Sequence, residues 1–352
     1  MDNTAQVRLT QFSHGGGCGC KIAPKVLEEI LASNIQFPNA DKLIVGNSSK
    51  DDAAVYDLGN GTALISTTDF FTPIVDDAYS FGQIASANAI SDVYAMGGKP
   101  ILAIAILGWP IEKISTTVAQ QVLEGSKKIC AEAGIPLAGG HSIDSTEPIF
   151  GLAVNGIVSI NHLKQNDTAK ENDVLFLTKP IGVGIISTAQ KRGALKEEHA
   201  AAFIQQLSQL NAAGEALGKI KGVHAMTDVT GFGLLGHLIE MAEGSGLSAE
   251  LNYSAIPILT SAKEYLAQRM IPDATYRNWN SYSNRVAFGT GVDVMEAFNV
   301  LPDPQTNGGL LIAAHISAVD EVKTVLKQYN ILHTTPIGKI TAKQEKTITV
   351  NL

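Results

Sequence analysis

The chain has 352 residues, of which 45% are hydrophobic and 17% charged, and this length favours two domains because one hydrophobic core rarely serves more than about 250–300 residues. Its formal net charge of -8, with no basic stripe among the 26 Lys and Arg, argues against a nucleic-acid partner. No apolar run reaches the roughly 18 residues of a membrane span, and three cysteines provide no disulfide framework, so we expect a cytoplasmic protein that contacts no membrane.

The segment 13–21, Ser-His-Gly-Gly-Gly-Cys-Gly-Cys-Lys, places two thiols and an ammonium group among four glycines. Without an apolar anchor it cannot hold one conformation alone, which predicts a mobile loop that closes over a ligand. The Lys21 ammonium would lower the pKa of a neighbouring thiol and make it a better nucleophile. A disordered tail with incidental cysteines explains the composition equally well. His14 with Cys18 and Cys20 supplies at most three ligands, one fewer than a closed zinc site needs.

After a short helix at 25–31, two strands are predicted at 53–58 and 62–68, on either side of a tight turn centred on Asn60. In such a hairpin, residues whose numbers sum to about 120 lie opposite each other, so three carboxylates meet at one end. These are Asp51, Asp52 and Asp69, with Asp51 facing Asp69 and Asp52 facing Thr68. A divalent cation would relieve their mutual repulsion. The alternative is an exposed, solvated end of a sheet.

Residues 81–96 have helical spacing, with Ile84 and Ala87 on the buried side. Asn88 and Asp92 are four residues apart and therefore project from one face of this helix. Such a pair is ordinarily the solvated side of a helix. Because the acidic hairpin directly precedes this helix, the pair is also a candidate for the same site.

The rest of the first half alternates strands and helices. Residues 100–107 form an uninterrupted apolar run, which is typical of a strand covered on both faces. A helix is predicted at 115–133, a short strand at 135–138 and a longer strand at 149–159. The loop Gly139-Gly140-His141-Ser142 follows the short strand, and its glycines would allow close backbone approach to a ligand.

A polar segment at 162–172 is predicted to link the two domains. Beyond it the alternation continues, which indicates an α/β or α+β layered fold. Strands are predicted at 174–178 and 310–314, and helices at 184–192, 199–217 and 318–329, before two short final strands.

The motif Thr227-Asp-Val-Thr-Gly-Phe-Gly233 is predicted to open a helix that runs to about residue 242. Asp228 is either the N-cap of this helix or a functional carboxylate. Gly231 and Gly233 each weaken a helix by up to ~1 kcal/mol, so they indicate that another group packs closely there. A second motif, Asp-Pro-Gln-Thr-Asn-Gly-Gly at 303–309, is predicted to be a turn that leads into a strand.

Five aspartates from both halves of the chain are candidates for one site: Asp51, Asp52, Asp69, Asp92 and Asp228. No Ser-His-Asp pattern accompanies them. Magnesium prefers carboxylates together with phosphate oxygens, and phosphoryl transfer needs mainly positioning and charge neutralisation. The aspartates therefore favour ATP-dependent phosphoryl transfer, but they do not identify the acceptor.

Seven segments carry a resemblance to a known family. They are HGGGCGCK (14–21), GNSSKDDAAVYDLGNGT (46–62), STTDFF (66–71), NAISDVYAMGGKP (88–100), AGGHSID (138–144), TDVTGFGLLGH (227–237) and DPQTNGG (303–309). Together they closely resemble the selenide, water dikinase (selenophosphate synthetase) family, over nearly the whole chain. The aspartate and TGxG motifs also fit the wider aminoimidazole ribonucleotide synthetase-like superfamily, and the CGCK loop narrows the resemblance to the dikinase.

The resemblance implies an α+β fold in which a ferredoxin-like N-terminal domain dimerises through its sheet into a barrel and a C-terminal α+β domain follows. The implied divisions are 1–48 for the segment with the mobile Gly-rich loop, 49–160 for the ATP- and magnesium-binding domain, and 172–352 for the C-terminal domain. The implied reaction converts ATP, selenide and water into selenophosphate, AMP and orthophosphate, in a homodimer whose subunits share the active site.

Residue roles are implied only where the motifs match. Cys18 would be the catalytic residue, Lys21 would meet the phosphates, and Asp52, Asp92 and Asp228 would ligate Mg²⁺. The implied ATP contacts are Lys21, Ser49, Lys50, Asp51, Asp69, Asp92, Gly140, His141 and Ser142, the last three from the partner subunit. The chain departs from the family at GGG, where relatives often carry GAG, and at Asn307, where serine is common.

Two other functions remain open. One is another ATP-dependent kinase or synthetase of the same superfamily, which would release ADP rather than AMP as the final product. The other is a non-enzymatic selenium or metal carrier that uses the Cys18–Cys20 pair and does not turn over ATP.

Overall fold

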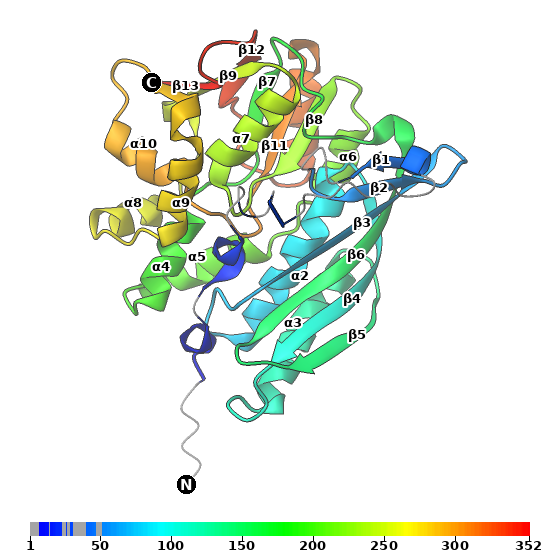
Figure 1. Ribbon diagram of the computed structural model, residues 1–352, viewed down its shortest axis with the longest axis vertical. Helices are drawn as coiled ribbons and strands as arrows, with labels where there is room; N and C mark the ends of the chain where they lie inside the picture. The colour runs from blue at the N-terminus through cyan, green and yellow to red at the C-terminus, as the bar shows by residue number, and fades with distance from the viewer. Residues whose placement is uncertain (1–6, 14, 23–25, 27–28, 31–39, 47–50) are drawn as a thin grey trace.

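The computed structural model describes residues 7–13, 15–22, 26, 29–30, 40–46 and 51–352, and it confirms the predicted α+β class. Two β-sheets are each covered by helices, and helix α2 lies between the N-terminal sheet and the C-terminal half (Figure 1). The predicted helix at 25–31 lies largely outside the described residues. Among the described helices, none combines the length and the apolar character needed to cross a bilayer. The predicted division at 49–160 and 172–352 stays a prediction.

The N-terminal sheet has six strands in the order β1-β2-β3-β6-β4-β5. Its strands are β1 (Leu43–Val45), β2 (Ala54–Asp57), β3 (Thr62–Phe71), β4 (Lys99–Trp109), β5 (Leu137–Asp144) and β6 (Ile149–Ser159). Helices α2 (Ala78–Ala95) and α3 (Thr116–Glu132) cover one face of this sheet (Figure 1). On that face, Phe71, Phe81 and Phe150 join β3, α2 and β6, with ring centroids 6.1 and 6.3 Å apart.

The predicted hairpin register is confirmed, because Ala54 pairs with Ser66 and Val55 pairs with Ile65. The ladder begins only at Ala54, however, so the predicted pairing of Asp51 with Asp69 and of Asp52 with Thr68 does not form. These two aspartates precede the strand, where no ladder constrains their backbone. Asp52 is thereby free to turn toward the C-terminal half.

Helix α2 is almost wholly buried, and this overturns the idea that Asn88 and Asp92 lie on a solvated face. Asn88 is fully buried and Asp92 is 7% exposed. The helix packs on the sheet and on α3 and also contacts β8 (Val223–Asp228) of the C-terminal half. An amphipathic pattern therefore cannot be read from α2, because both of its faces are covered.

The opposite face of the N-terminal sheet is open, which contradicts the prediction that the 100–107 strand is covered on both faces. Within this chain, Ile101 and Ile104 of β4 remain 40% and 39% exposed, and Phe70 of β3 remains 51% exposed. Large apolar side chains therefore gather on an uncovered sheet face.

The segment Gly140–Ser142 also differs from its prediction. It is not a loop after a short strand, because it belongs to β5 and pairs in parallel with β4, Gly140 lying opposite Ala105. A Cβ atom at Gly140 would come within 2.3 Å of the Ala105 carbonyl oxygen, so a glycine at this position allows β5 to pair closely with β4. β5 is an exposed edge strand.

The C-terminal sheet has seven strands in the order β10-β13-β9-β12-β7-β11-β8. The strands other than β8 are β7 (Val174–Leu177), β9 (Ser248–Asn252), β10 (Val286–Phe288), β11 (Leu310–Ala314), β12 (Gly338–Thr341) and β13 (Ile348–Asn351). The helices are α4 (Val183–Lys191), α5 (Glu197–Ser208), α6 (Ala213–Gly218), α7 (Gly233–Gly244), α8 (Thr260–Ala267), α9 (Asp273–Tyr282), α10 (Val294–Val300) and α11 (Val319–Gln328).

Both faces of this sheet are buried, since Ile312 packs with α6 and α11 while Leu311 packs in the main core.

The single helix predicted at 199–217 is two helices, α5 and α6. The break falls at residues 209–212, where the carbonyl oxygen of Gln209 accepts hydrogen bonds from Lys179 and Asn307. Because Lys179 and Asn307 are distant in sequence, the apolar periodicity alone does not reveal the break. It positions Asn211 toward the site described below.

Candidate functional site

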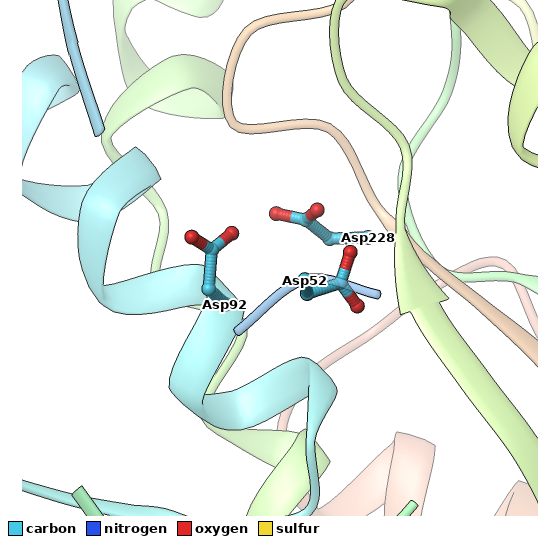
Figure 2. A group of neighbouring side chains, drawn as sticks. All are labelled: Asp52, Asp92 and Asp228. Carbon is cyan, nitrogen blue, oxygen red and sulfur yellow. The ribbon is translucent and has the colours of Figure 1, made fainter. Parts of the chain in front are cut away.

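Three carboxylates from separate elements meet at one point. Oxygens of Asp52, Asp92 and Asp228 all lie within 4.8 Å of one another, around a common space between α2 and the end of β8 (Figure 2). Asp228 is the last residue of β8, and α7 begins only at Gly233, so the N-cap interpretation is wrong. The site therefore lies where the segment before β2, helix α2 and strand β8 of the C-terminal sheet meet.

The electrostatics of this triad favour a cation. Burial raises the pKa of Asp52 and of Asp92 well above the usual range, and neighbouring carboxylates raise both further. Burial likewise raises the pKa of Asp228 to about 6. The Asp52 Oδ2 atom is buried and has no hydrogen-bond partner in the described part of the chain. Carboxylate oxygens so arranged are the ligands that hard divalent cations prefer, and the triad fits such an ion.

A hydroxyl group holds each carboxylate through one of its oxygens. The donors are Thr227 to Asp52 Oδ1 at 2.8 Å, Thr67 to Asp92 Oδ2 at 2.5 Å, and Ser91 to Asp228 Oδ2 at 2.5 Å. In turn, Asn211 Nδ2 donates to Ser91 Oγ at 2.8 Å. These groups orient the carboxylates around the common space. The sequence patterns do not predict them, although Ser91 and Thr227 immediately precede two of the aspartates.

A second cluster adjoins the triad through Asp69. Lys21 Nζ lies 3.7 Å from Asp69 Oδ1, and Asn88 Nδ2 donates to Asp69 Oδ2 at 2.6 Å. The Asp69 carboxylate raises the pKa of Lys21 more than partial burial lowers it, so this ammonium stays charged. Cys18 Sγ donates to Asn88 Oδ1 at 3.3 Å, and Cys18 is only 1% exposed. Asn88 therefore connects the thiol to the acidic cluster.

The thiol loop, residues 15–21, is packed against both halves of the chain. Gly17 N donates to the Thr72 carbonyl oxygen at 3.0 Å, and Cys18 N donates to Thr306 Oγ1 at 2.9 Å. A Cβ atom at Gly231 would lie 2.7 Å from the Cys18 carbonyl oxygen. The close packing predicted from the glycines after Asp228 is thus confirmed: the thiol loop packs on Gly231, and the backbone of Pro302 and Asp303 packs on Gly233.

The turn at 303–309 supports the same region. Asn307 adopts a positive φ of 46°, its backbone N donates to Asn88 Oδ1 at 2.7 Å, and its side chain bonds the carbonyl oxygens at the end of α5. Lys179 Nζ donates to the Asn307 carbonyl oxygen at 2.9 Å, and burial lowers the pKa of Lys179 to about 7. Nothing in the sequence marks Lys179, because a lone lysine after a strand is ordinarily exposed.

The remaining predicted site residues are not all brought together. Asp51 lies beside the triad but outside it, accepting a hydrogen bond from Asn166 N at 3.3 Å, and burial raises its pKa to about 7. Ser49 and Lys50 lie outside the described residues. Gly140, His141 and Ser142 lie on β5, at the far edge of the sheet from β2, so one chain does not bring them to the triad.

Sequence profiles of two families match most of the chain. Residues 50–158 match the family described as AIR synthase related protein, N-terminal domain, and residues 170–351 match its C-terminal domain. The chain thus belongs to the AIR synthase related proteins.

Comparison with individual proteins identifies a narrower family within this class. A protein of Aeromonas hydrophila named selenide, water dikinase is 55% identical over 96% of this chain and 97% of its own length. Proteins with the same name from Photorhabdus laumondii and Pseudomonas putida are 52% and 53% identical, over 99% and 98% of both chains. The chain belongs to the selenide, water dikinase family, which is a family of enzymes.

Solved structures of other proteins share this fold although their sequences are less than 20% identical to this chain. The hydrogenase maturation protein HypE in complex with ATP has a TM-score of 0.66 and is 19% identical, covering 97% of this chain and 93% of its own. Thiamine monophosphate kinase of Aquifex aeolicus has a TM-score of 0.65 and is 18% identical, covering 93% and 94%. These likenesses concern the arrangement of helices and strands.

Proposed function

We propose that this chain catalyses the ATP-dependent synthesis of selenophosphate from selenide and water, with release of AMP and orthophosphate. The observation that carries the proposal is the placement of Cys18 and Lys21 beside the acidic triad, joined through Asn88 and Asp69. Membership of the selenide, water dikinase family supports the choice of selenide as acceptor.

In this proposal, Asp52, Asp92 and Asp228 hold Mg²⁺, which neutralises phosphate charge when bound. The hydroxyl donors Thr227, Thr67 and Ser91 keep the carboxylates oriented toward the ion. ATP lies along the triad, with Asp69, Asp51 and the 49–50 segment as its neighbours. HypE, which shares this fold, is known in complex with ATP.

The residues of the thiol loop would act on the terminal phosphoryl group. Lys21, kept protonated by Asp69, would move to the γ-phosphate oxygens and stabilise the negative charge there. Selenide is already anionic at neutral pH, so the site needs no strong general base. Cys18, shielded from solvent, would position the selenium for attack on the γ-phosphorus while the loop excludes water. Water then cleaves the remaining anhydride bond and gives AMP and orthophosphate.

A homodimer would complete the site. The uncovered sheet face carries Phe70, Ile101, Ile104 and Ile157, and β5 adds Ile143, which is 60% exposed. A second copy packing on this face would bury these side chains in a closed barrel and bring its own Gly140–Ser142 segment toward the nucleotide. We place this dimer in the cytoplasm.

The decisive experiment is phosphorus NMR of the protein with ATP, Mg²⁺ and selenide under anaerobic conditions. The proposal predicts a new phosphorus–selenium species together with AMP and orthophosphate. ADP as the final product would instead identify another kinase or synthetase of the superfamily. Absence of ATP turnover would favour a selenium or metal carrier that uses the Cys18–Cys20 pair.

A further inference from the structure

Two exposed cations of the C-terminal half hold the backbone of the thiol loop. Lys191, the last residue of α4, donates from Nζ to the carbonyl oxygens of Ser13 at 3.0 Å and Gly15 at 3.2 Å. Arg277 of α9 donates from Nη2 to the carbonyl oxygen of Gly19 at 3.0 Å. The two sets of contacts lie on either side of Cys18 in the sequence, so together they fix the segment that carries the thiol.

The loop is held by apolar packing as well as by these cations, since Ile74 lies against Gly17 and Pro304 lies against Gly19. A cavity of about 290 Å³ is lined by Gly15, Gly16 and Gly19 together with Lys191 and Arg277. Because the cavity leaves part of these glycines without packed neighbours, apolar burial alone does not fix them there. The charged hydrogen bonds therefore add to this packing in setting the position of the loop.

The charges around the cavity suit this role. Its lining includes the cations Lys191, Arg192 and Arg277 but a single acid, Asp273. Backbone carbonyl oxygens of the loop carry partial negative charge and face an excess of positive charge. Arg192 differs from Lys191 and Arg277 because it donates to the Arg269 carbonyl oxygen and to Met270 Sδ, and among the described residues it has no hydrogen bond to the loop.

We propose that Lys191 and Arg277 are positioning residues that latch the thiol loop closed and so hold Cys18 against Asn88. They act through the loop backbone, at carbonyl oxygens on either side of Cys18. The inference rests on the proposed function in one respect, which is that Cys18 is the functional thiol. With the loop latched, Cys18 is 1% exposed, so selenide reaches the thiol only after the latch releases.

The latch is tested by the rate at which iodoacetamide alkylates Cys18 in the nucleotide-free protein. Lys191→Met and Arg277→Met each remove the donors of exposed side chains, so the fold is retained while the open fraction of the loop rises. We expect alkylation about five- to tenfold faster in each variant and faster still in the double variant. Fragment ions of the labelled peptide separate Cys18 from Cys20, and amide exchange of residues 15–20 rises in parallel.

Arg192→Met is the matched control, because it removes a cation from the same cavity without removing a bond to the loop. Its alkylation rate stays within about twofold of the original chain, and Lys191→Arg, which keeps a donor, largely restores slow alkylation. An unchanged rate in the double variant, or an equal acceleration in Arg192→Met, would overturn the latch. The readout uses no selenide, so a failed latch and a failed dikinase assay are separate results.

Discussion

The thiol of Cys18 lies 3.3 Å from Asn88 Oδ1, while the amide nitrogen of the same asparagine donates to Asp69. One buried side chain thus joins the thiol loop to the acidic cluster on β3. Because Asn88 also accepts a hydrogen bond from Asn307 N, its orientation is set by the C-terminal half as well. The thiol is therefore held at the acidic site by contacts from both halves of the chain.

Replacement of Cys18 by serine removes the thiol and keeps a hydroxyl donor toward Asn88. We expect selenophosphate formation to be abolished, while the dissociation constant for ATP changes by less than about threefold, because the acidic triad is untouched. Phosphorus NMR and equilibrium nucleotide binding provide the two measurements. Unimpaired synthesis at low selenide would show that the thiol has no part in the reaction.

Replacement of Asp228 by asparagine removes one carboxylate of the triad, and its effect on unfolding can be measured both without and with a divalent cation. The folded pKa of Asp228 is raised to about 6, so its stabilising contribution is present at low pH and is lost as pH rises through that value. At pH 8 with EDTA, we expect the unfolding free energy of Asp228→Asn to be about 1–2 kcal/mol higher than that of the original chain, so the variant is the more stable protein.

In millimolar Mg²⁺ we expect the original chain to have the higher unfolding free energy, because it gains binding free energy that Asp228→Asn lacks. Glu345→Gln, which removes an exposed charge elsewhere, is the control and responds to Mg²⁺ like the original chain. Equal stabilisation of Asp228→Asn by Mg²⁺ would count against the triad as the metal site.

Gly231→Ala places a methyl group where the thiol loop packs. The added Cβ would come within 2.7 Å of the Cys18 carbonyl oxygen and 3.3 Å of Lys21 Cδ, so the loop has to move outward. We expect selenophosphate formation to fall at least about tenfold, with faster alkylation of Cys18 and little change in thermal stability. Unchanged alkylation and activity would mean that this contact does not set the loop position.

Buried His237 makes the fold sensitive to acid. Burial lowers the pKa of His237 to about 3, and its Nε2 accepts a hydrogen bond from Thr230 N at 3.1 Å. Because the folded pKa lies below the unfolded value, the contribution is present above about pH 6.5 and is lost as pH falls toward 3.

Between pH 7.5 and 5, the original chain should therefore lose about 2 kcal/mol more unfolding free energy than His237→Gln. Denaturant unfolding across this pH range gives the comparison. Parallel curves for the two proteins would exclude His237 as the source of the acid sensitivity.

The uncovered sheet face predicts a dimer that depends on Ile104. A lysine at this position places a charge where an apolar side chain, 39% exposed in one chain, would be buried by the second copy. Ile104→Lys is expected to raise the dimer dissociation constant at least about 100-fold, measured by sedimentation.

A mixture of the Asp92→Asn and His141→Ala proteins then tests the shared site. If each active site takes His141 from the other subunit, mixed dimers contain one intact site and recover part of the activity. Absence of recovery in demonstrably mixed dimers would argue that the site is not shared.

The sequence by itself determined the local features of this protein. The turn at Asn60 and the strand pattern around it fixed the β2–β3 register, because residues in a tight hairpin are close in sequence. The spacing of apolar residues predicted the bounds of α3, β6 and β11 to within a residue or two. The glycines after Asp228 indicated close packing because glycine weakens a helix unless another group uses the space.

The tertiary structure alone decided which polar groups meet. Asp52 joins Asp92 and Asp228 across 40 and 176 residues of sequence, and the hydroxyls, Asn211 and Lys179 around them leave no local pattern. The break between α5 and α6 and the placement of Gly140–Ser142 inside β5 also depend on distant partners. The physical reason is that hydrophobic periodicity reports the local conformation and which side of an element is buried, whereas the contacts of a buried polar group depend on how distant elements pack.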